Sequence, residues 1–323
     1  MTVHRKLTIV ALAAALLAGA CGNDEPAPGA AETGEPTAST EATADTGDDA
    51  TTSSVTDPST DDADVPEAII SLSPTATEML FAIDAGDQVV AVDDESDFPA
   101  GVPTTDLSGF EPNVEAIAAF EPDLVVLQGG YDDAVAGLEA LDIEVLVQPA
   151  ATTLDDTYDQ IAELGIVTGH EDEAAALVAD MRAEIDALSA AIPRRTEPLT
   201  YYHELDPLLY SVTDRTFIGQ LYTLAQLTSI ANVADPDGAL GGYPQVSAEL
   251  IVDADPDVVF LADSECCGET AETFAARPGF ADLSAVRNGA VVNLSDDVAS
   301  RWGPRVVEML RTIIEATASV PVG

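Results

Sequence analysis

Arg301 is followed directly by Trp302, which is the single tryptophan of this 323-residue chain. A guanidinium beside a large aromatic ring can bind a planar or anionic chelate through charge-assisted hydrogen bonds and stacking. The alternative is that Trp302 packs into a hydrophobic core, and the sequence favours neither. Arg305, four residues further on, is expected to be an ordinary charge on a helix surface.

The histidines argue against direct capture of a metal ion. After the first 20 residues the chain contains only His170 and His203, whereas a transition-metal site usually needs several imidazole or thiolate ligands. We therefore expect no resident metal and no cofactor, and any metal should arrive already chelated. His170 is expected at the surface. His203 ends a β-rich run, where it either faces a ligand or caps the strand.

Cys266 and Cys267 are adjacent and follow the apolar run 257–261. In a compartment where disulfides persist, the two cysteines can form a vicinal disulfide, which would give a ligand a rigid apolar contact surface. Two free thiols, or a loop clip without ligand contact, are the alternatives. With no further cysteines nearby, the pair does not make a zinc site.

Signatures of the commoner enzyme classes are absent. The chain has no G-x-G-x-x-G after its first strand, no G-x-x-x-x-G-K-[ST], no H-E-x-x-H and no G-x-S-x-G, so we do not expect an enzyme. Two other classes stay open. A lipid-anchored hydrolase would show a nucleophile and a base paired in a cleft, and a surface adhesion module would show an exposed apolar patch.

The charge balance excludes nucleic acid as a partner. The chain has 11 Lys and Arg against 59 Asp and Glu, a formal net charge of −48, whereas phosphate contacts require a basic patch. The same sign opposes attraction to anionic lipid. The hydrophobic fraction of 46% is ample for a folded core.

Residues 1–20 have the pattern of a lipoprotein signal peptide. A basic start is followed by an apolar stretch that is too short to span a bilayer. The ending LLAGAC resembles a bacterial lipobox, which implies that Cys21 is lipidated and begins the mature chain; an ordinary secretory signal is the alternative. We expect the protein to be extracytoplasmic and anchored by this lipid to the outer face of the cell membrane.

Residues 21–66 are predicted to be the lipidated cysteine followed by a disordered acidic tether. From residue 22 this stretch has twelve carboxylates and no Lys, Arg, Leu, Ile or aromatic residue. Such a segment cannot offset its ordering entropy by burial. We interpret it as a passive spacer.

From residue 67 the pattern alternates between short β-rich runs and helical stretches. Strands are predicted at 68–72, 88–92, 123–127 and 143–147, and helices at 75–84, 113–120, 131–141 and 154–167. Residues 171–191 form one long amphipathic helical pattern, and a second α/β run begins at Leu199. We therefore predict an α/β fold of two Rossmann-like lobes with parallel sheets, 67–168 and 194–323, joined by one long rigid helix within 169–193.

An internal repeat supports this division into two lobes. Residues 113–127 align without gaps with residues 247–261, so that Glu115 meets Glu249. Each copy contains an N-cap residue, a short helix, a Pro-Asp turn and a buried strand. Two similar lobes create a cleft at their interface, which is a preferred place for a ligand.

Several stretches resemble one family. ISLSPTATEML, NVEAI, EPDLVV, YPQVSAE and RWGPRVVEML are similar to segments of the substrate-binding lipoproteins of bacterial ABC importers for ferric siderophores, haem and cobalamin, the class III periplasmic binding proteins. The resemblance covers residues 67–323. It implies two α/β lobes bridged by one helix, small closing motions, and an ABC permease dimer with its cytoplasmic ATPase as partner.

The resemblance also implies a role for the repeated glutamates. In the family, a glutamate at each of these positions lies on top of its lobe and pairs with arginines of the permease, so Glu115 and Glu249 are the expected docking residues. A glutamate in the first turn also complements the helix dipole, by about 0.3–1 kcal/mol. Both roles can hold together.

The ligand cleft is expected among the loops that follow the strands. The candidates are Ser73, Pro74, Glu95, Phe110, Gln128 and Tyr131 from the first lobe and Tyr202, His203, Tyr243, Arg301 and Trp302 from the second. A ferric siderophore is the first expectation because it is the commonest ligand in the family. Cobalamin follows, since YPQVSAE resembles the cobalamin-binding members, and haem is the other alternative.

Overall fold

The computed structural model describes residues 65–318 and 320. The predicted signal peptide, Cys21 and nearly all of the predicted tether lie outside these residues. The described residues fall within one compact unit. In this part of the chain, no helix combines the length and the apolar character that crossing a lipid bilayer requires.

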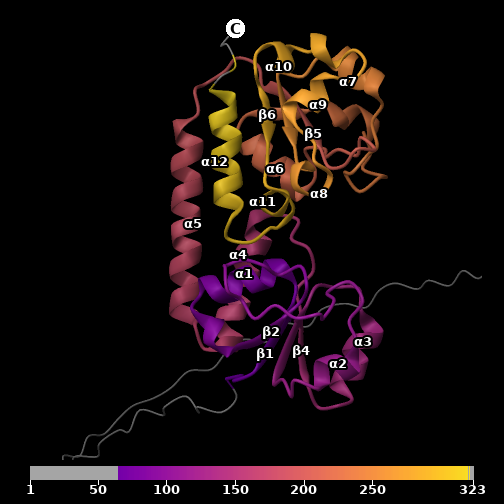
Figure 1. Ribbon diagram of the computed structural model, residues 1–323. Coiled ribbons are helices and arrows are strands. Elements are labelled where there is room, and N and C mark those ends of the chain that lie inside the picture. The colour runs from indigo at the N-terminus through magenta and orange to yellow at the C-terminus, as the bar shows by residue number, and fades with distance from the viewer. Residues whose placement is uncertain (1–64, 319, 321–323) are drawn as a thin grey trace, which may run out of the picture. The chain divides into compact units, whose positions relative to one another are not determined.

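Two parallel four-stranded sheets form the framework (Figure 1). The first lobe is built on the sheet β2-β1-β3-β4 and the second lobe on β6-β5-β7-β8. The strands are β1 (Ile69–Leu72), β2 (Val89–Val92), β3 (Leu124–Leu127), β4 (Glu144–Val147), β5 (Leu199–Glu204), β6 (Leu227–Ser229), β7 (Val258–Leu261) and β8 (Val291–Asn293). Strands β1, β3 and β7 are buried along their whole length, as expected where helices cover both faces of a parallel sheet. The first four strands each begin one residue later than predicted and end at the predicted residue.

The helices surround these sheets. They are α1 (Pro74–Ala82), α2 (Val114–Ala118), α3 (Asp132–Glu139), α4 (Leu154–Thr168), α5 (Glu171–Ala191), α6 (Phe217–Leu224), α7 (Ala248–Ala254), α8 (Ser264–Cys267), α9 (Ala271–Ala275), α10 (Ser284–Arg287), α11 (Asp296–Ser300) and α12 (Val306–Thr317), with short 3-10 turns at Ala85–Gln88, Ile230–Ala234 and Phe280–Asp282. In Figure 1, α5 runs alongside both lobes. The predicted fold of two parallel-sheet lobes joined by a long helix is confirmed.

The two lobes repeat one design. Their sheets have the same strand order, and α2 and β3 precede α7 and β7 by the same 134 positions as the sequence repeat. Both helices begin with a side-chain cap: Asn113 Oδ1 accepts from Ala116 N at 3.0 Å, and Ser247 Oγ accepts from Leu250 N at 3.1 Å. The same local chemistry therefore fixes the start of each helix.

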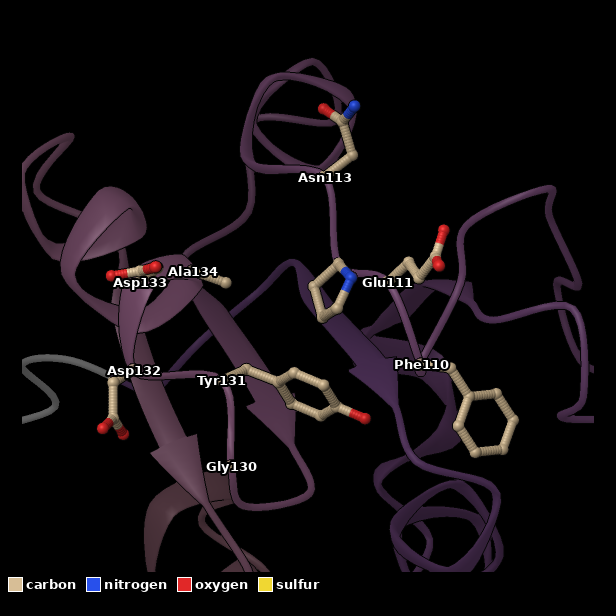
Figure 2. Close-up of a pocket in the computed structure, with 9 residues that line it drawn as sticks. Phe110, Glu111, Asn113, Gly130, Tyr131, Asp132, Asp133 and Ala134 are labelled. Carbon is tan, nitrogen blue, oxygen red and sulfur yellow. The ribbon is translucent and has the colours of Figure 1, made fainter. Parts of the chain in front are cut away.

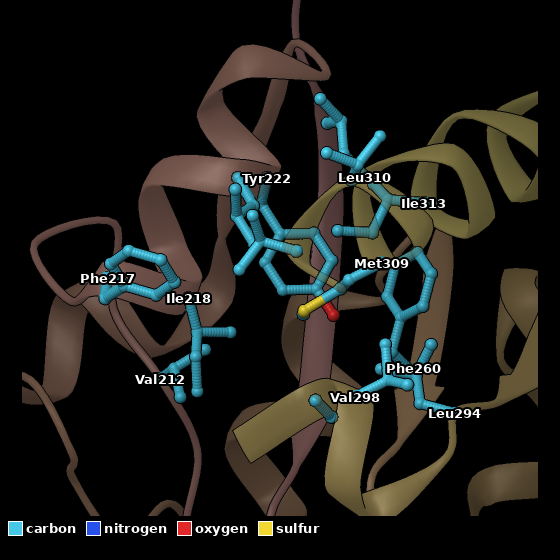
Figure 3. Packing of buried hydrophobic residues seen from close by; sticks show 14 of the residues in the cluster. Val212, Phe217, Ile218, Tyr222, Phe260, Leu294, Val298, Met309, Leu310 and Ile313 are labelled. Atoms are coloured by element: carbon cyan, nitrogen blue, oxygen red, sulfur yellow. The ribbon is translucent and has the colours of Figure 1, made fainter. Parts of the chain in front are cut away.

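One large hydrophobic cluster runs through both lobes and includes side chains of α4, α5 and α12. Figure 3 shows its part in the second lobe, where Tyr222, Phe260 and Met309 meet. A smaller cluster lies on the opposite face of the first sheet, where Ile117 of α2 and Leu138 of α3 cover it. This packing holds α2 and α3 beside each other on the first lobe.

Candidate ligand pocket and lobe contact

A pocket of about 620 Å³ opens in the first lobe (Figure 2). Its lining comes from residues 110–113, which lead into α2, and from residues 130–134, which lead from β3 into α3. Phe110 and Tyr131, both named as ligand contacts from the sequence, therefore lie in the same pocket. Their contact with a ligand stays a prediction.

The loop that carries Phe110 is held in place by the two residues that precede it, Ser108 and Gly109. A Cβ atom on Gly109 would lie 2.7 Å from Asp93 Oδ2 and 2.9 Å from the carbonyl oxygen of Leu72, so only glycine allows this loop to approach the carboxyl end of β1. Ser108 Oγ accepts hydrogen bonds from the backbone N–H groups of Phe110 and Glu111, both at 3.2 Å. Phe110 is 73% exposed and is accessible to a ligand.

The opposite wall follows β3. Gly130 has a φ of +100°, a conformation that glycine adopts without strain, and it turns the chain into α3. Tyr131 then precedes the helix without capping it through its side chain. Figure 2 shows its hydroxyl pointing toward the side of the pocket on which Phe110 lies. Two aromatic side chains thus border one opening.

The rim of this pocket is acidic. Glu111, Asp132 and Asp133 are exposed, and the pocket lining contains no cationic side chain. Asp132 and Asp133 lie in the first turn of α3, where negative charge is favourable. Coulomb repulsion from these carboxylates would weaken the binding of an anionic ligand. The pocket therefore suits a large neutral or cationic ligand with an apolar edge. These acidic residues were not predicted, although the Asp-Asp pair directly after a strand and turn was a visible signal.

The structure corrects the prediction for Tyr202 and His203. Both side chains are completely buried in β5, a strand with neighbours on both sides. The Tyr202 hydroxyl donates to Glu204 Oε2 at 3.0 Å, and His203 Nδ1 lies 2.7 Å from the Tyr222 hydroxyl. Burial lowers the pKa of His203 to about 3. Both are core residues, because β5 continues to Glu204 and is covered on both faces.

The other residues predicted to contact the ligand lie at separate places in the two lobes. Ser73 is buried, and its hydroxyl accepts from Ala76 N at 3.4 Å as the cap of α1, which begins at the half-buried Pro74. Gln128 is half-buried, and Tyr243 is 43% exposed in the second lobe, where burial raises its pKa. None of these lines the pocket around Phe110.

Trp302 takes part in a contact between the lobes. Its indole Nε1 donates to Gln160 Oε1 at 2.9 Å, and its carbonyl oxygen accepts from Thr157 Oγ1 at 2.9 Å; both partners belong to α4. The ring is partly buried against the large core cluster. Trp302 thus packs against this cluster at a contact between the lobes, and its contact with a ligand stays a prediction.

Arg301 and Arg305 bind the same buried carboxylate. Glu78 of α1 is 2% exposed, and its Oε1 accepts from Arg301 at 3.0 Å while its Oε2 accepts from Arg305 Nε at 2.9 Å. Arg301 also donates to Asp97 and Asp297, and to the backbone oxygen, rather than the side chain, of the exposed Glu95.

The expectation that Arg305 is an ordinary surface charge is therefore wrong. Its guanidinium also stacks 4.2 Å above the Phe98 ring, and Glu78 raises its pKa. The segment between α11 and α12 is thus bound to the first lobe.

Cys266 and Cys267 are joined in a disulfide at the exposed end of α8. Asp296 accepts hydrogen bonds from the backbone N–H groups of Glu265 and Cys266, at 3.2 and 2.7 Å. This contact ties α8 to the start of α11. Neither cysteine lines the pocket around Phe110, and a contact with ligand stays a prediction.

Glu115 and Glu249 are both exposed on the first turns of α2 and α7. Among the described residues neither enters a salt bridge. Their carboxylates are therefore not neutralised within this part of the chain. Among the same residues, no group of three or more His, Cys, Asp and Glu side chains is placed to hold a metal ion.

The sequence and the fold of this chain were compared with those of known proteins. Residues 69–298 match the family model described as Periplasmic binding protein. The chain is 32% identical over 263 residues to the cobalamin-binding protein of Halobacterium salinarum, an alignment that covers 78% of this chain and 69% of that protein. It is 29% identical over 260 residues to the uncharacterized ABC transporter substrate-binding lipoprotein YvrC of Bacillus subtilis, covering 78% and 80%.

Among solved structures, the crystal structure of an ABC-type Fe3+-hydroxamate transport system from Saccharomonospora viridis is similar, with a TM-score of 0.60 and 27% identity. The match covers 78% of this chain and 93% of that one. The family model reaches from β1 across α5 to α11 and so includes both sheets. On this evidence the chain belongs to the periplasmic binding protein family.

Proposed function

We propose that this protein is the substrate-binding component of an ABC importer, which captures a small chelate outside the cytoplasm and delivers it to a permease and its ATPase. The observation that carries the proposal is the match of one binding-protein family model across both lobes. The names of the Bacillus and Saccharomonospora relatives, both from ABC transport systems, support it. The protein would bind its ligand without altering it.

We propose a corrinoid as the first ligand to test. The Halobacterium relative, at 32% identity, is named for cobalamin. Cobalamin is large, carries neutral amides around its ring and has no cluster of carboxylates, so it suits a pocket with two aromatic side chains and an acidic rim. The siderophore expected first from the sequence is supported by the 27% identical Saccharomonospora structure. A neutral or cationic ferric hydroxamate fits the same rim better than an anionic ferric catecholate or haem, which carries two propionates.

The proposed location rests on residues outside the described part of the chain. We propose that Cys21 is lipidated and that the acidic segment after it holds the two lobes above the outer face of the membrane. The printed name of the Bacillus relative includes the word lipoprotein. Incorporation of radioactive palmitate that disappears in Cys21→Ala would support the anchor, and equal incorporation would contradict it.

We also propose that Glu115 and Glu249 dock the protein on the permease. They are exposed and occupy equivalent positions on α2 and α7. These two helices lie on the side of the lobes away from α5 in Figure 1. In Glu115→Ala with Glu249→Ala, uptake by cells should be lost while ligand affinity stays intact. A loss of affinity equal to the loss of uptake would contradict the docking role.

The ligand is tested by titration of the purified mature chain. Trp302 is its only tryptophan, so quenching of its fluorescence reports binding of an absorbing chelate at one known position. Cyanocobalamin, ferrioxamine, a ferric catecholate and haem are compared. We expect cyanocobalamin to bind with a Kd of about 1 μM or tighter, and Phe110→Ala to weaken it while Phe120→Ala, an exposed ring outside the pocket, does not. Absence of binding by all four would contradict the proposal.

A further inference from the structure

The Cys266–Cys267 disulfide lies on a turn that is fixed at its start. The two cysteines end α8, which follows β7 closely. Ser264 Oγ donates to the carbonyl oxygen of Leu294 at 2.8 Å, directly after β8, and Asp296 accepts from Cys266 N at 2.7 Å. The start of the turn is therefore bound to the segment that links β8 to α11.

The turn is fixed at its end as well. Gly268, with a φ of +72°, ends α8, and Glu269 then binds Arg277 at 3.0 Å. Arg277 also donates to the buried Glu204 at the end of β5, at 2.7 Å, and Thr273 Oγ1 donates to Glu269 at 2.8 Å. Because both ends are bound to other parts of the second lobe, the fold sets the position of the two cysteines.

The two cysteines are nevertheless exposed, although cysteine is among the residue types that are most often fully buried. A disulfide has no hydrogen to donate, and its sulfur atoms are weak acceptors, so water gains little from contact with it. A bond between adjacent residues also closes no long stretch of chain, and it therefore restricts the unfolded chain very little. Stability of the fold thus gives little reason for the pair.

The turn lies beside the contact between the lobes. Burial raises the pKa of Asp297 in α11, and the nearby carboxylates of Asp97 and Glu265 act in the same direction. Asp297 is thus close both to Glu265 of α8 and to Asp97 of the first lobe. Arg301 binds the same two aspartates, at 2.6 and 3.1 Å. Figure 1 shows α8 and α11 at the end of the second lobe that faces the first lobe.

We propose that the Cys266–Cys267 disulfide is a ligand contact of the second lobe, against which an apolar edge of the captured chelate packs. The proposal rests on the binding function proposed above and adds a contact chemistry to it. Sulfur is polarisable and packs well against hydrocarbon groups, such as the methyl groups of a corrin ring or the methylene chains of a ferric hydroxamate. The exposed Glu265 beside the pair disfavours an anionic ligand. Phe110 and Tyr131 contact the same ligand from the first lobe.

The first test asks whether a ligand shields the two cysteines from a thiol reagent. The purified mature chain is reduced, freed of the reductant and labelled with N-ethylmaleimide, with and without cyanocobalamin or ferrioxamine, and the labelled peptides are identified by mass spectrometry. Two reporter variants calibrate the result: Asp132→Cys at the rim of the pocket, and Val233→Cys at a site that is 68% exposed elsewhere in the second lobe.

Cyanocobalamin at ten times its Kd should slow the labelling of Cys266, Cys267 and position 132 about tenfold. It should leave position 233 unchanged. This readout uses the native cysteines, so it does not depend on how a substitution affects the turn.

The second test separates contact with the ligand from support of the turn. The double variant Cys266→Ser with Cys267→Ser and the double variant Cys266→Ala with Cys267→Ala both lack the disulfide, but only serine places hydroxyl groups against the apolar edge of the ligand. Isothermal titration calorimetry with cyanocobalamin should give a Kd about tenfold higher for the serine variant and about threefold higher or less for the alanine variant. Val233→Ser is the matched control and should leave the Kd unchanged.

The outcomes distinguish this proposal from the binding function on which it rests. Equal Kd values for the serine and alanine variants, or protection of position 132 without protection of the cysteine pair, would overturn the disulfide contact alone. If neither ligand protects position 132 or the pair, the binding function itself fails. Protection of the pair without position 132 would support the disulfide contact and contradict the pocket around Phe110.

Discussion

Glu78 Oε2 accepts a hydrogen bond from Arg305 Nε at 2.9 Å, although the two residues are 227 positions apart and belong to different lobes. Arg301 donates to the same carboxylate at 3.0 Å. The lobes are therefore connected at a second place besides α5. If the lobes moved relative to each other about α5 alone, α1 and the segment between α11 and α12 would have to move together. This contact therefore limits how far the lobes can separate.

The first prediction concerns Glu78→Gln. The substitution removes a buried negative charge and leaves two guanidinium groups without their shared partner. The free energy of unfolding should fall by about 3–5 kcal/mol, measured by urea denaturation. The matched control is Asp155→Asn, which removes the exposed Asp155–Arg182 pair, whose side chains are 76% and 52% exposed; it should cost about 1 kcal/mol or less. Equal effects of the two substitutions would show that the Glu78 contact does not stabilise the fold.

The second prediction concerns the pocket in the first lobe. Phe110→Ala and Tyr131→Ala each remove an aromatic side chain that borders the opening. Each should weaken binding of the proposed corrinoid about tenfold or more, because truncating an aromatic residue that acts as a binding hot spot costs about 2 kcal/mol or more. Isothermal titration calorimetry measures the change, with Phe120→Ala as control. Unchanged affinity in both variants would place the ligand elsewhere.

The third prediction concerns the buried carboxyl group of Asp263. Burial, together with Glu204 and Glu269, raises its pKa to about 7, and its two oxygens have no hydrogen-bond partner among the described residues. Between about pH 4 and pH 7 the Asp263 carboxyl group therefore keeps its proton in the folded protein. In the unfolded chain, where its pKa has the ordinary value of 3.8, the group has lost that proton. The contribution of this group to stability is full at low pH, falls as the pH rises from about 4 to about 7, and is constant above that.

Asp263→Asn should remove this slope, which is at most about 1.4 kcal/mol per pH unit. Urea denaturation of both proteins at several pH values measures it. His203 opposes the effect: its folded pKa of about 3 lies below its ordinary 6.5, so its contribution is lost as the pH falls from about 6.5 to about 3. The variant should therefore gain stability with rising pH between 4 and 6.5, and a slope parallel to that of the wild-type protein would contradict the role given to Asp263.

The sequence predicted those features that local patterns determine. Buried runs such as the one ending at Leu127 and capping residues such as Asn113 locate strands and helices to within a few residues. The pairing of Glu78 with Arg305 was not predictable, because no local pattern links residues in different lobes. Tyr202 and His203 were misplaced for a related reason: the pattern locates a strand but does not tell where it ends, and β5 continues through Glu204.

The last prediction compares the two copies of the repeat. Asn113 and Ser247 cap α2 and α7 through equivalent hydrogen bonds of 3.0 and 3.1 Å. Replacement of either by alanine leaves one backbone N–H without its partner and should lower the free energy of unfolding by about 1 kcal/mol. The caps lie on separate lobes with no shared partner, so the double variant should lose the sum of the two effects within about 0.5 kcal/mol. Denaturation of the two single variants and the double variant measures this, and a larger deviation from additivity would mean that the helices carrying Glu115 and Glu249 are energetically coupled before any partner binds.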